Sequence, residues 1–260
     1  MGGIIPAKQG EVIIDLMGIG RSYKNGGQEV KALKEVDLQI KQGEFIGIIG
    51  PSASGKSTLL NLLGCLDTPT TGVYRLHGKQ VNSLSTKDKA LIRNKIFGFV
   101  FQSFHLLPDL NVNANVALPL KYGKTPKRQR ATLVKNALSM VGLSDIGEKY
   151  PDQLSGGQQQ RIAIARALIN NPDIILADEP TGCLDIATGQ SIMEELLSLR
   201  NELNRTVIVI THDPRIAGYA DRLIRIEDGI IKEDTLLSQS NISVSESKIK
   251  NPFEVLEQED

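Results

Sequence analysis

The chain has 260 residues, and 30 basic side chains balance 30 acidic ones for a formal net charge of zero. This balance argues against a nucleic-acid binder, which usually carries a basic excess. The two cysteines, Cys65 and Cys183, lack CxxC-type spacing, so we expect no disulfide framework or zinc site and favour a reducing compartment. The start lacks a secretion signal, and no apolar run approaches the roughly 20 residues that span a bilayer. We therefore expect a cytosolic chain whose membrane role would pass through a partner.

Strand and helix signals alternate after a loose leader at 1–10. Leucines at helical spacing behind a glycine turn predict a helix at 57–65. Short runs of β-branched residues, separated by Gly and Asn, predict the first strands: 12–16, 31–40, 44–49 and a strand pair at 72–82.

From about 89 to 168 strand signals become sparse, which predicts an inserted helical subdomain. Alternation then returns, and its near-continuous apolar strands predict an α/β fold with a parallel sheet covered on both faces. The helical patterns lie at 87–95, 125–141, 157–168 and 188–203, and the later buried strands lie at 173–177 and 206–210.

We expect one domain at 11–234, whose core (11–88 and 169–234) carries the helical subdomain as an insertion. The last residues, 235–260, are rich in Ser, Gln and acidic residues and lack a strong period, which predicts a mobile tail. A short docking helix at 252–256 is the alternative interpretation of that tail.

A glycine-rich loop joins an apolar strand to the leucine-rich helix. Its sequence GPSASGKS fits G-x-x-x-x-G-K-[ST], in which backbone N–H groups and a helix N-terminus bind phosphate. Lys56 is expected to reach the outer phosphates of a nucleotide, and the Ser57 hydroxyl to coordinate Mg²⁺. The predicted nucleotide-binding residues of this loop are Gly50, Pro51, Ser52, Ala53, Ser54, Gly55, Lys56, Ser57 and Thr58.

Two adjacent carboxylates follow the buried strand at 173–177. Asp178 is expected to hold Mg²⁺, directly or through water, and Glu179 to orient and polarise the attacking water. Alone, such a pair could equally cap the next element, but beside a phosphate loop the functional interpretation is favoured. His212 follows the strand at 206–210, at the carboxyl end where open α/β sheets gather their sites, and is interpreted as a γ-phosphate contact.

A second candidate anion-binding helix start begins at Ser155. This serine can cap the helix, and Gly156, Gly157 and Gln158 expose backbone N–H groups at its N-terminus. A plain capped helix is the alternative interpretation. Two such starts with one triphosphate cradle make sense if each serves a different copy of the nucleotide, which requires a head-to-tail dimer with ATP at its interface.

Six motifs occur in order: GPSASGKS, FQSFHLLP, LSGGQQQR, IILADEP, TGCLD and VITHD. Together they resemble the ABC ATPase family over about 12–234. The resemblance implies a P-loop NTPase (RecA-like) core with an N-terminal antiparallel β subdomain, and hydrolysis of ATP with Mg²⁺.

The same resemblance implies further residue roles. Tyr23 lies where an aromatic residue stacks on adenine. Gln102 lies where a glutamine contacts Mg²⁺ and the attacking water, in the loop that touches the membrane subunit. Ser155 and Gly157 would bind the γ-phosphate of the opposite subunit's ATP, and Asp185 would connect the two sites across the dimer.

Finer stretches, among them LGCLDTPTTG and NVALPL, are similar to the ATPases of the macrolide-exporter and lipoprotein-releasing group. That group, which includes a related cell-division ATPase, implies a permease with few spans and a large extracytoplasmic domain. It also implies a place at the cytoplasmic face of the inner (plasma) membrane. Ala53, His105, Ala114 and Cys183 depart from the residues common at these positions (glycine, asparagine, glutamate, and alanine or asparagine).

The sequence thus predicts an ATPase subunit that dimerises on two Mg-ATP and drives a permease, for export or lipoprotein release. A regulatory ATPase that signals through a permease-like partner, without a transported substrate, is the alternative. A soluble ABC ATPase acting on nucleic acid or ribosomes fits less well, because the chain has one cassette, no long heptad run and balanced charge.

Overall fold

The computed structural model describes residues 10–25, 28–213 and 218–237. The leader expected at 1–10 and the tail expected at 235–260, with its alternative helix at 252–256, therefore fall almost entirely outside the described residues. Within the described part of the chain, no helix combines the length and apolar character needed to cross a membrane.

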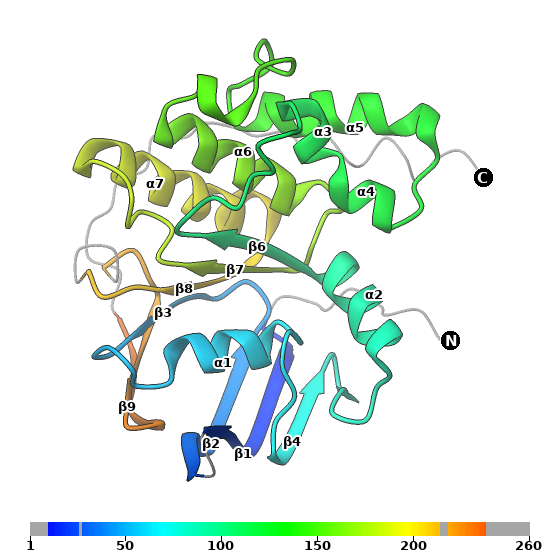
Figure 1. The fold of residues 1–260 in the computed structure, drawn as a ribbon. Helices are drawn as coiled ribbons and strands as arrows, with labels where there is room; N and C mark the ends of the chain where they lie inside the picture. The colour runs from blue at the N-terminus through cyan, green and yellow to red at the C-terminus, as the bar shows by residue number, and fades with distance from the viewer. Residues whose placement is uncertain (1–9, 26–27, 214–217, 238–260) are drawn as a thin grey trace.

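A six-stranded sheet forms the middle of the molecule (Figure 1). All neighbouring strands in it pair in parallel except the edge pair of β10 and β9, which is antiparallel. In spatial order the strands are β10 (Ile230–Leu236), β9 (Arg222–Glu227), β3 (Phe45–Ile49), β8 (Thr206–Ile210), β7 (Ile174–Asp178) and β6 (Phe97–Phe101).

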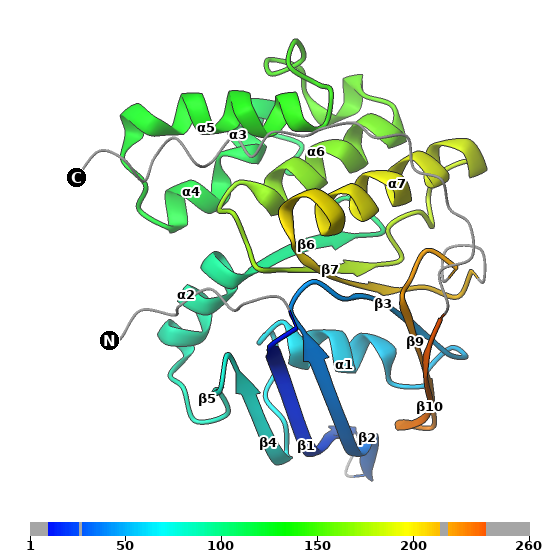
Figure 2. The same ribbon diagram turned by 180° about the vertical axis from the view of Figure 1, so that it is seen from behind.

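A second sheet of four antiparallel strands lies beside the first (Figure 2). Together with the parallel sheet, it confirms the predicted α/β class with an N-terminal antiparallel part. Its order is β2 (Gln28–Lys41), β1 (Val12–Asn25), β4 (Thr71–Leu76) and β5 (Lys79–Gln80).

The larger sheet separates two hydrophobic cores. Because side chains alternate across a strand, Ile208 and Ile210 of β8 pack on one side with α1 and the smaller sheet, whereas Val207 and Val209 pack on the other with α6 and α7. Both ribbon views show α1 on one side of this sheet and α6 and α7 on the other. The helices are α1 (Lys56–Leu63), α2 (Thr86–Ile96), α3 (Val112–Val116), α4 (Leu118–Tyr122), α5 (Lys127–Met140), α6 (Gly156–Leu168) and α7 (Ile186–Leu203), with a 3₁₀ turn at Pro151–Gln153.

The sequence did not predict the strand β6, which lies within the range 89–168 that was expected to be helical. Its five residues, FGFVF, pair in parallel with β7, and the strand belongs to the core sheet. A short apolar run of this length has no period that separates a buried strand from a helix segment. The insertion on the core is therefore carried by the helices that follow β6 rather than by the whole expected range. At the other end, β10 continues to Leu236, two residues past the expected boundary at 234.

Candidate functional site

The loop from Gly50 to Gly55 joins β3 to α1, and its glycines are required by close packing. A Cβ on Gly50 would lie 2.0 Å from the carbonyl oxygen of Ile226. Gly55 has φ 105, and a Cβ there would lie 2.6 Å from the carbonyl oxygen of Ala32. Backbone groups therefore approach this loop so closely that no side chain fits at either position.

The first turn of α1 leaves polar groups unsatisfied. Gly55 occupies the N-cap without any side-chain cap, so N–H groups of the first turn have no side-chain acceptor. The Ser54 hydroxyl is buried without a hydrogen-bond partner among the described residues. The Lys56 ammonium donates to the carbonyl oxygens of Gly50 (2.9 Å) and Pro51 (2.7 Å) and so lies over the loop. Such a loop is built to accept an anion.

The predicted acidic pair lies at the end of β7, next to this loop. Burial raises the pKa of the Asp178 carboxyl, the negative charge of Glu179 adds to the rise, and the positive charge of Lys56 opposes it. Lys56 is therefore close enough to act on the Asp178 carboxyl, so the phosphate loop and the acidic strand end lie next to each other. Glu179 Oε1 lies 2.7 Å from His212 Nδ1, so two of the residues predicted to act on water and the γ-phosphate are in direct contact.

Gln102 directly follows β6, whose last residue pairs with Asp178 on β7. Its side chain packs against Gly182, since a Cβ on that glycine would lie 2.6 Å from Gln102 Nε2. Gln102 therefore lies between the acidic strand end and the segment leading to Asp185. The donors predicted for a cation are the oxygens of Ser57, Gln102 and Asp178, and this oxygen chemistry suits Mg²⁺, which is commonly held by few carboxylates together with phosphates.

The second candidate anion site, at the start of α6, is closed on itself. The Ser155 hydroxyl accepts from the Gln158 N–H (3.3 Å), and the Gln158 side chain accepts from the Ser155 N–H (3.1 Å). Gly157 packs against α7, where a Cβ would lie 2.6 Å from Thr188 Cγ2. The start of α6 is thus held against the start of α7, whose N-cap is Asp185.

Asp185 caps α7. Its carboxylate accepts from the N–H (3.0 Å) and the hydroxyl (2.6 Å) of Thr188. These bonds lower the pKa of Asp185, the hydroxyl of Thr188 having the largest effect. The residue predicted to communicate between subunits is therefore fixed beside the α6 start.

The two candidate anion sites do not meet within one chain. Residues 50–58 lead into α1 on one side of the core sheet, whereas Ser155, Gly156, Gly157 and Gln158 begin α6 on its other side (Figures 1 and 2). The structure thus joins the phosphate loop with Asp178, Glu179 and His212, and joins the α6 start with Asp185, as two separate groups.

Tyr23 lies near the end of β1 with 37% of its surface exposed. Its hydroxyl donates to Asp67 Oδ2 (2.8 Å), and the guanidinium of Arg21 lies 4.5 Å from its ring centroid. The sequence analysis did not single out Arg21 or Asp67. The available signal was the spacing of Arg21 and Tyr23, which places both side chains on the same side of a strand.

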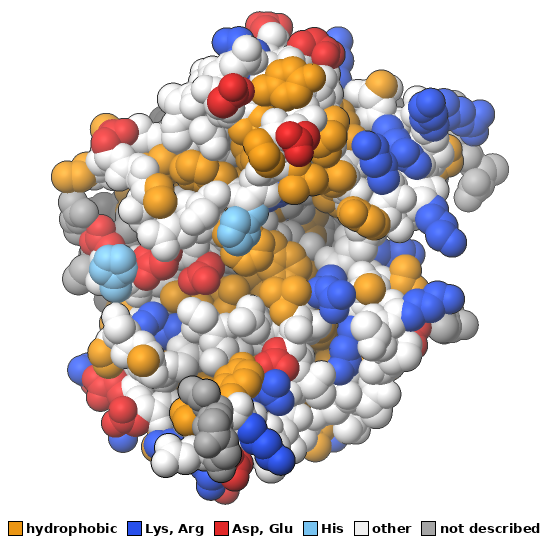
Figure 3. Space-filling model, viewed as in Figure 1, with side chains coloured by type: hydrophobic (Ala, Val, Ile, Leu, Met, Phe, Trp, Pro, Cys, Tyr) orange, Lys and Arg blue, Asp and Glu red, His pale blue; other side chains and the backbone are white. Residues whose placement is uncertain are grey.

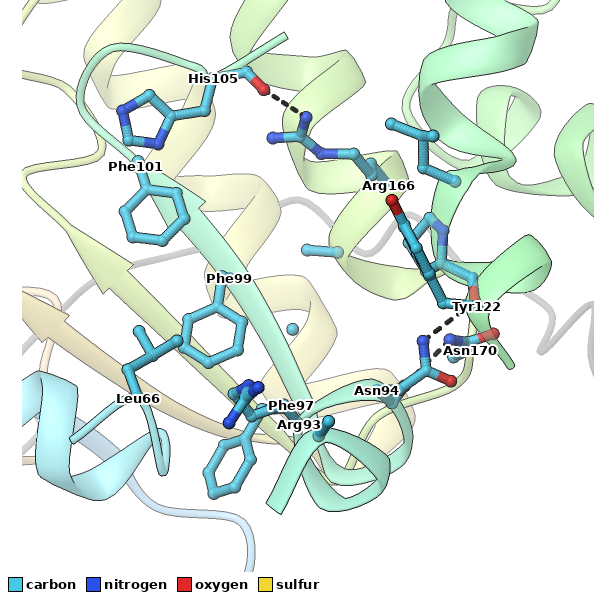
Figure 4. A pocket seen from close by; sticks show the side chains of 15 residues that line it. Leu66, Arg93, Asn94, Phe97, Phe99, Phe101, His105, Tyr122, Arg166 and Asn170 are labelled. Carbon is cyan, nitrogen blue, oxygen red and sulfur yellow. Dashed lines mark hydrogen bonds between the residues drawn. The ribbon is translucent and has the colours of Figure 1, made fainter. Parts of the chain in front are cut away.

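A separate cavity of about 550 Å³ opens between β6, α2, α4 and α6. Figure 3 shows this part of the surface as a hydrophobic hollow with basic side chains gathered beside it. The rings of Phe99 and Phe101 stack with centroids 5.9 Å apart, and that of His105 follows 4.7 Å from Phe101 (Figure 4). Arg166 donates to the carbonyl oxygens of Phe104 and His105 and thereby holds one wall in place.

A family model described as ABC transporter matches residues 33–182. The chain belongs to the ABC transporter family. It is 46% identical over 219 residues to the uncharacterized ABC transporter ATP-binding protein YknY of Bacillus subtilis. The aligned residues cover 84% of this chain and 95% of YknY. It is 44% identical to the macrolide export ATP-binding/permease protein MacB of Vibrio parahaemolyticus, over 93% of this chain but only 36% of MacB. The cassette therefore spans about a third of the length of such MacB relatives.

Solved ABC cassettes share the fold. The dimeric post-hydrolysis structure of the cassette MJ0796, bound to ADP and Pi, superposes with a TM-score of 0.80 and is 44% identical, covering 87% of this chain and 99% of that one. The match confirms the predicted family and fold, and the predicted class of enzyme, an ABC ATPase. The individual roles of the site residues remain predictions from the sequence.

Proposed function

We propose that this ABC ATPase works as a head-to-tail dimer that closes on two Mg-ATP and drives a membrane permease of the MacB type. One observation carries the proposal: two glycine-rich helix starts lie on opposite sides of the core sheet. Because each start lies on its own side of the sheet, we infer that a complete site combines the phosphate loop of one copy with the α6 start of another. The dimeric state named for the similar MJ0796 cassette supports this arrangement.

In this proposal the hydrolytic groups come from the strand ends of one copy. Glu179 orients and deprotonates the attacking water, and the nearby His212 contacts the γ-phosphate, positioned by its 2.7 Å contact with Glu179. Asp178, Ser57 and Gln102 would hold Mg²⁺, which neutralises phosphate charge when bound. The triphosphate favours the closed dimer because it contacts both copies, and loss of the γ-phosphate removes that preference.

The cavity beside β6 supports a permease partner. The cavity is rich in aromatic side chains, and neither Arg93 nor Arg166 at its edge forms an ion pair within the described residues. An amphipathic cytoplasmic helix with apolar and acidic side chains fits such a surface. Gln102 follows the same strand, so occupation of the cavity would be sensed at the nucleotide site. We place the dimer at the cytoplasmic face of the plasma membrane, and the export or lipoprotein-release role rests on the similarity to MacB.

Substituting Glu179→Gln tests the catalytic part. Removing a general base lowers turnover about 100-fold or more, while ATP binding persists, so the variant accumulates as a dimer in ATP and MgCl₂. Phosphate release and sedimentation velocity measure the two effects. Glu44→Gln is a matched control, since the Glu44 side chain is 19% exposed, close to the 17% of Glu179, and pairs with Arg222. Normal turnover in Glu179→Gln would remove this role from the residue.

The same variant identifies the partner. Tagged Glu179→Gln chain is purified from membranes solubilised with ATP and MgCl₂, and mass spectrometry identifies what accompanies it. We expect a permease with few spans and a large extracytoplasmic domain; recovery of ribosomal partners alone would overturn the transport role and leave the ATPase. Transport into membrane vesicles then separates an exporter from a regulatory complex without a transported substrate.

A further inference from the structure

Arg21, Tyr23 and Asp67 form a cluster at the edge of the antiparallel sheet. Arg21 binds Asp67 as a two-point pair, with Nε 2.8 Å from Oδ2 and Nη2 2.8 Å from Oδ1. Oδ2 also accepts from the Tyr23 hydroxyl at 2.8 Å, and Oδ1 accepts from the Thr68 N–H at 2.7 Å. Both carboxylate oxygens of Asp67 are thus occupied, and Tyr23 is tethered at its polar end.

The same cluster leaves one face of the Tyr23 ring open. The Arg21 guanidinium lies over the ring, 4.5 Å from its centroid, and covers one face as a cation–π contact does. The side chain remains 37% exposed. An aromatic ring that is fixed at its hydroxyl and covered on one side can stack only through the other.

The cluster belongs to the same packed unit as the phosphate loop. Gly55, at the end of that loop, packs against Ala32 and Leu33 of β2, and Leu33 pairs with Arg21 across β1 and β2. From the other side, the Asp67 N–H donates to the carbonyl oxygen of Asn61 on α1 (3.1 Å). The helix that begins at the phosphate loop therefore carries, just beyond its end, the carboxylate that holds Tyr23.

We propose that Arg21 and Asp67 are positioning residues, which hold the Tyr23 ring with one face ready to stack on the nucleotide base. The inference rests on the proposed function of the chain as an ATPase and on the role that the family resemblance implies for Tyr23, stacking on adenine. The gain is preorganisation: an exposed tyrosine loses side-chain freedom when it stacks, and a tether removes that freedom before the nucleotide arrives. Neither residue need touch the nucleotide itself.

The substitution Asp67→Asn tests the proposal. An amide has one acceptor oxygen where the carboxylate has two, so it cannot serve Arg21, Tyr23 and Thr68 together. Base–aromatic stacking contributes to the affinity of a nucleotide, and partial loss of it should raise the Kd for ADP about three- to tenfold. Inorganic tripolyphosphate has no base, so its Kd should stay within about twofold. Calorimetric titration measures both ligands without hydrolysis of ADP.

Two further variants make the result specific. Asp15→Asn is the matched control, because Asp15 also pairs with an arginine of this sheet, Arg75, but holds no aromatic ring; we expect its ADP affinity to be unchanged. Tyr23→Phe removes only the hydrogen bond from the Tyr23 hydroxyl to Asp67 and should raise the Kd for ADP about threefold. Adding Asp67→Asn to Tyr23→Phe should then raise the Kd for ADP by less than a further factor of about two, because both changes break the same connection.

The outcomes separate the inference from the function beneath it. Unchanged ADP affinity in Asp67→Asn would overturn the positioning role. An equal rise in the Kd values for ADP and tripolyphosphate would also overturn the positioning role, because such a result would show a general disturbance of the loop. Failure of the unsubstituted chain to bind ADP would overturn the proposed function itself, and this inference with it.

Discussion

The starts of α1 and α6 are both glycine-rich and both predicted to bind phosphate, but they are capped in opposite ways. At α1 the N-cap is Gly55, with left-handed backbone and no side-chain cap. At α6 the N-cap is Ser155, and a reciprocal capping box with Gln158 satisfies donors at the helix start. The first start therefore has no side-chain cap, whereas in the second the Ser155 and Gln158 N–H groups already have side-chain acceptors.

This difference suggests an order of events. We expect the α1 start to bind nucleotide in a single chain, since its uncapped N–H groups, the buried Ser54 hydroxyl and Lys56 all belong to one loop. In the proposed dimer, the α6 start would exchange its internal cap for contacts with the nucleotide of a second copy. Its contribution should therefore appear in dimerisation and hydrolysis rather than in the first binding step.

The largest expected effect follows from Lys56→Ala. The Lys56 ammonium lies over the loop, where it donates hydrogen bonds to the carbonyl oxygens of Gly50 and Pro51. Charge-assisted bonds from such a group to phosphate are strong. We expect the Kd for ADP to rise about 100-fold, in line with the loss of roughly 2–3 kcal/mol, and ATP turnover to disappear. Calorimetry and phosphate release measure these effects. Lys89→Ala, which removes a lysine bond to Thr68 near the far end of α1, is the control.

Ser155→Ala should have a different effect. We expect ADP binding within about twofold of the unsubstituted chain, because distant sites act independently, but a loss of ATP-dependent dimers and of hydrolysis. Ser85→Ala is the matched control, since Ser85 caps α2 through the Asp88 N–H at 3.1 Å. Both substitutions should lower stability by about 1 kcal/mol, which thermal unfolding measures. If both variants dimerise equally well, the α6 start has no role beyond its helix.

The contrast between these two starts also shows what the sequence could predict. Each is a contiguous motif, so residue types alone indicated a glycine-rich helix start. The contact of Glu179 with His212 was foreseeable as well, because both follow buried strands that end at the same edge of a parallel sheet. The sequence did not predict that the two starts lie on opposite sides of the sheet. That arrangement depends on which residues of each strand face which core.

Other features depended on contacts that no local pattern encodes. The Arg21–Asp67 pair joins residues 46 positions apart, and Asp67 lies in a loop whose path is set by β4 pairing with β1. β6 was missed because FGFVF is too short to display a period. Its partner β7 supplies the pairing that makes it a strand, and that information is non-local.

The smallest expected effect concerns Ala53, which stands in the open loop before α1. Its φ of 60° is left-handed, which costs an alanine roughly 1–2 kcal/mol. Ala53→Gly relieves this strain but also frees the unfolded chain, an opposing effect of about 0.4–1 kcal/mol, so thermal stability should rise only slightly. An alanine in place of the usual glycine would also be expected to lower nucleotide affinity if the loop had to adopt this conformation on binding.

The structure of the loop predicts instead that this strain leaves the nucleotide affinity unchanged. Ala53 has its left-handed backbone in a loop whose glycines, Gly50 and Gly55, pack closely against neighbouring backbone, so the strain belongs to the packing of the loop rather than to a contact with nucleotide. Calorimetry should therefore give a Kd for ADP in Ala53→Gly within about twofold of the unsubstituted chain. A gain of about fivefold or more would mean that the loop rearranges on binding, and the α1 start would then be no more preformed than the α6 start.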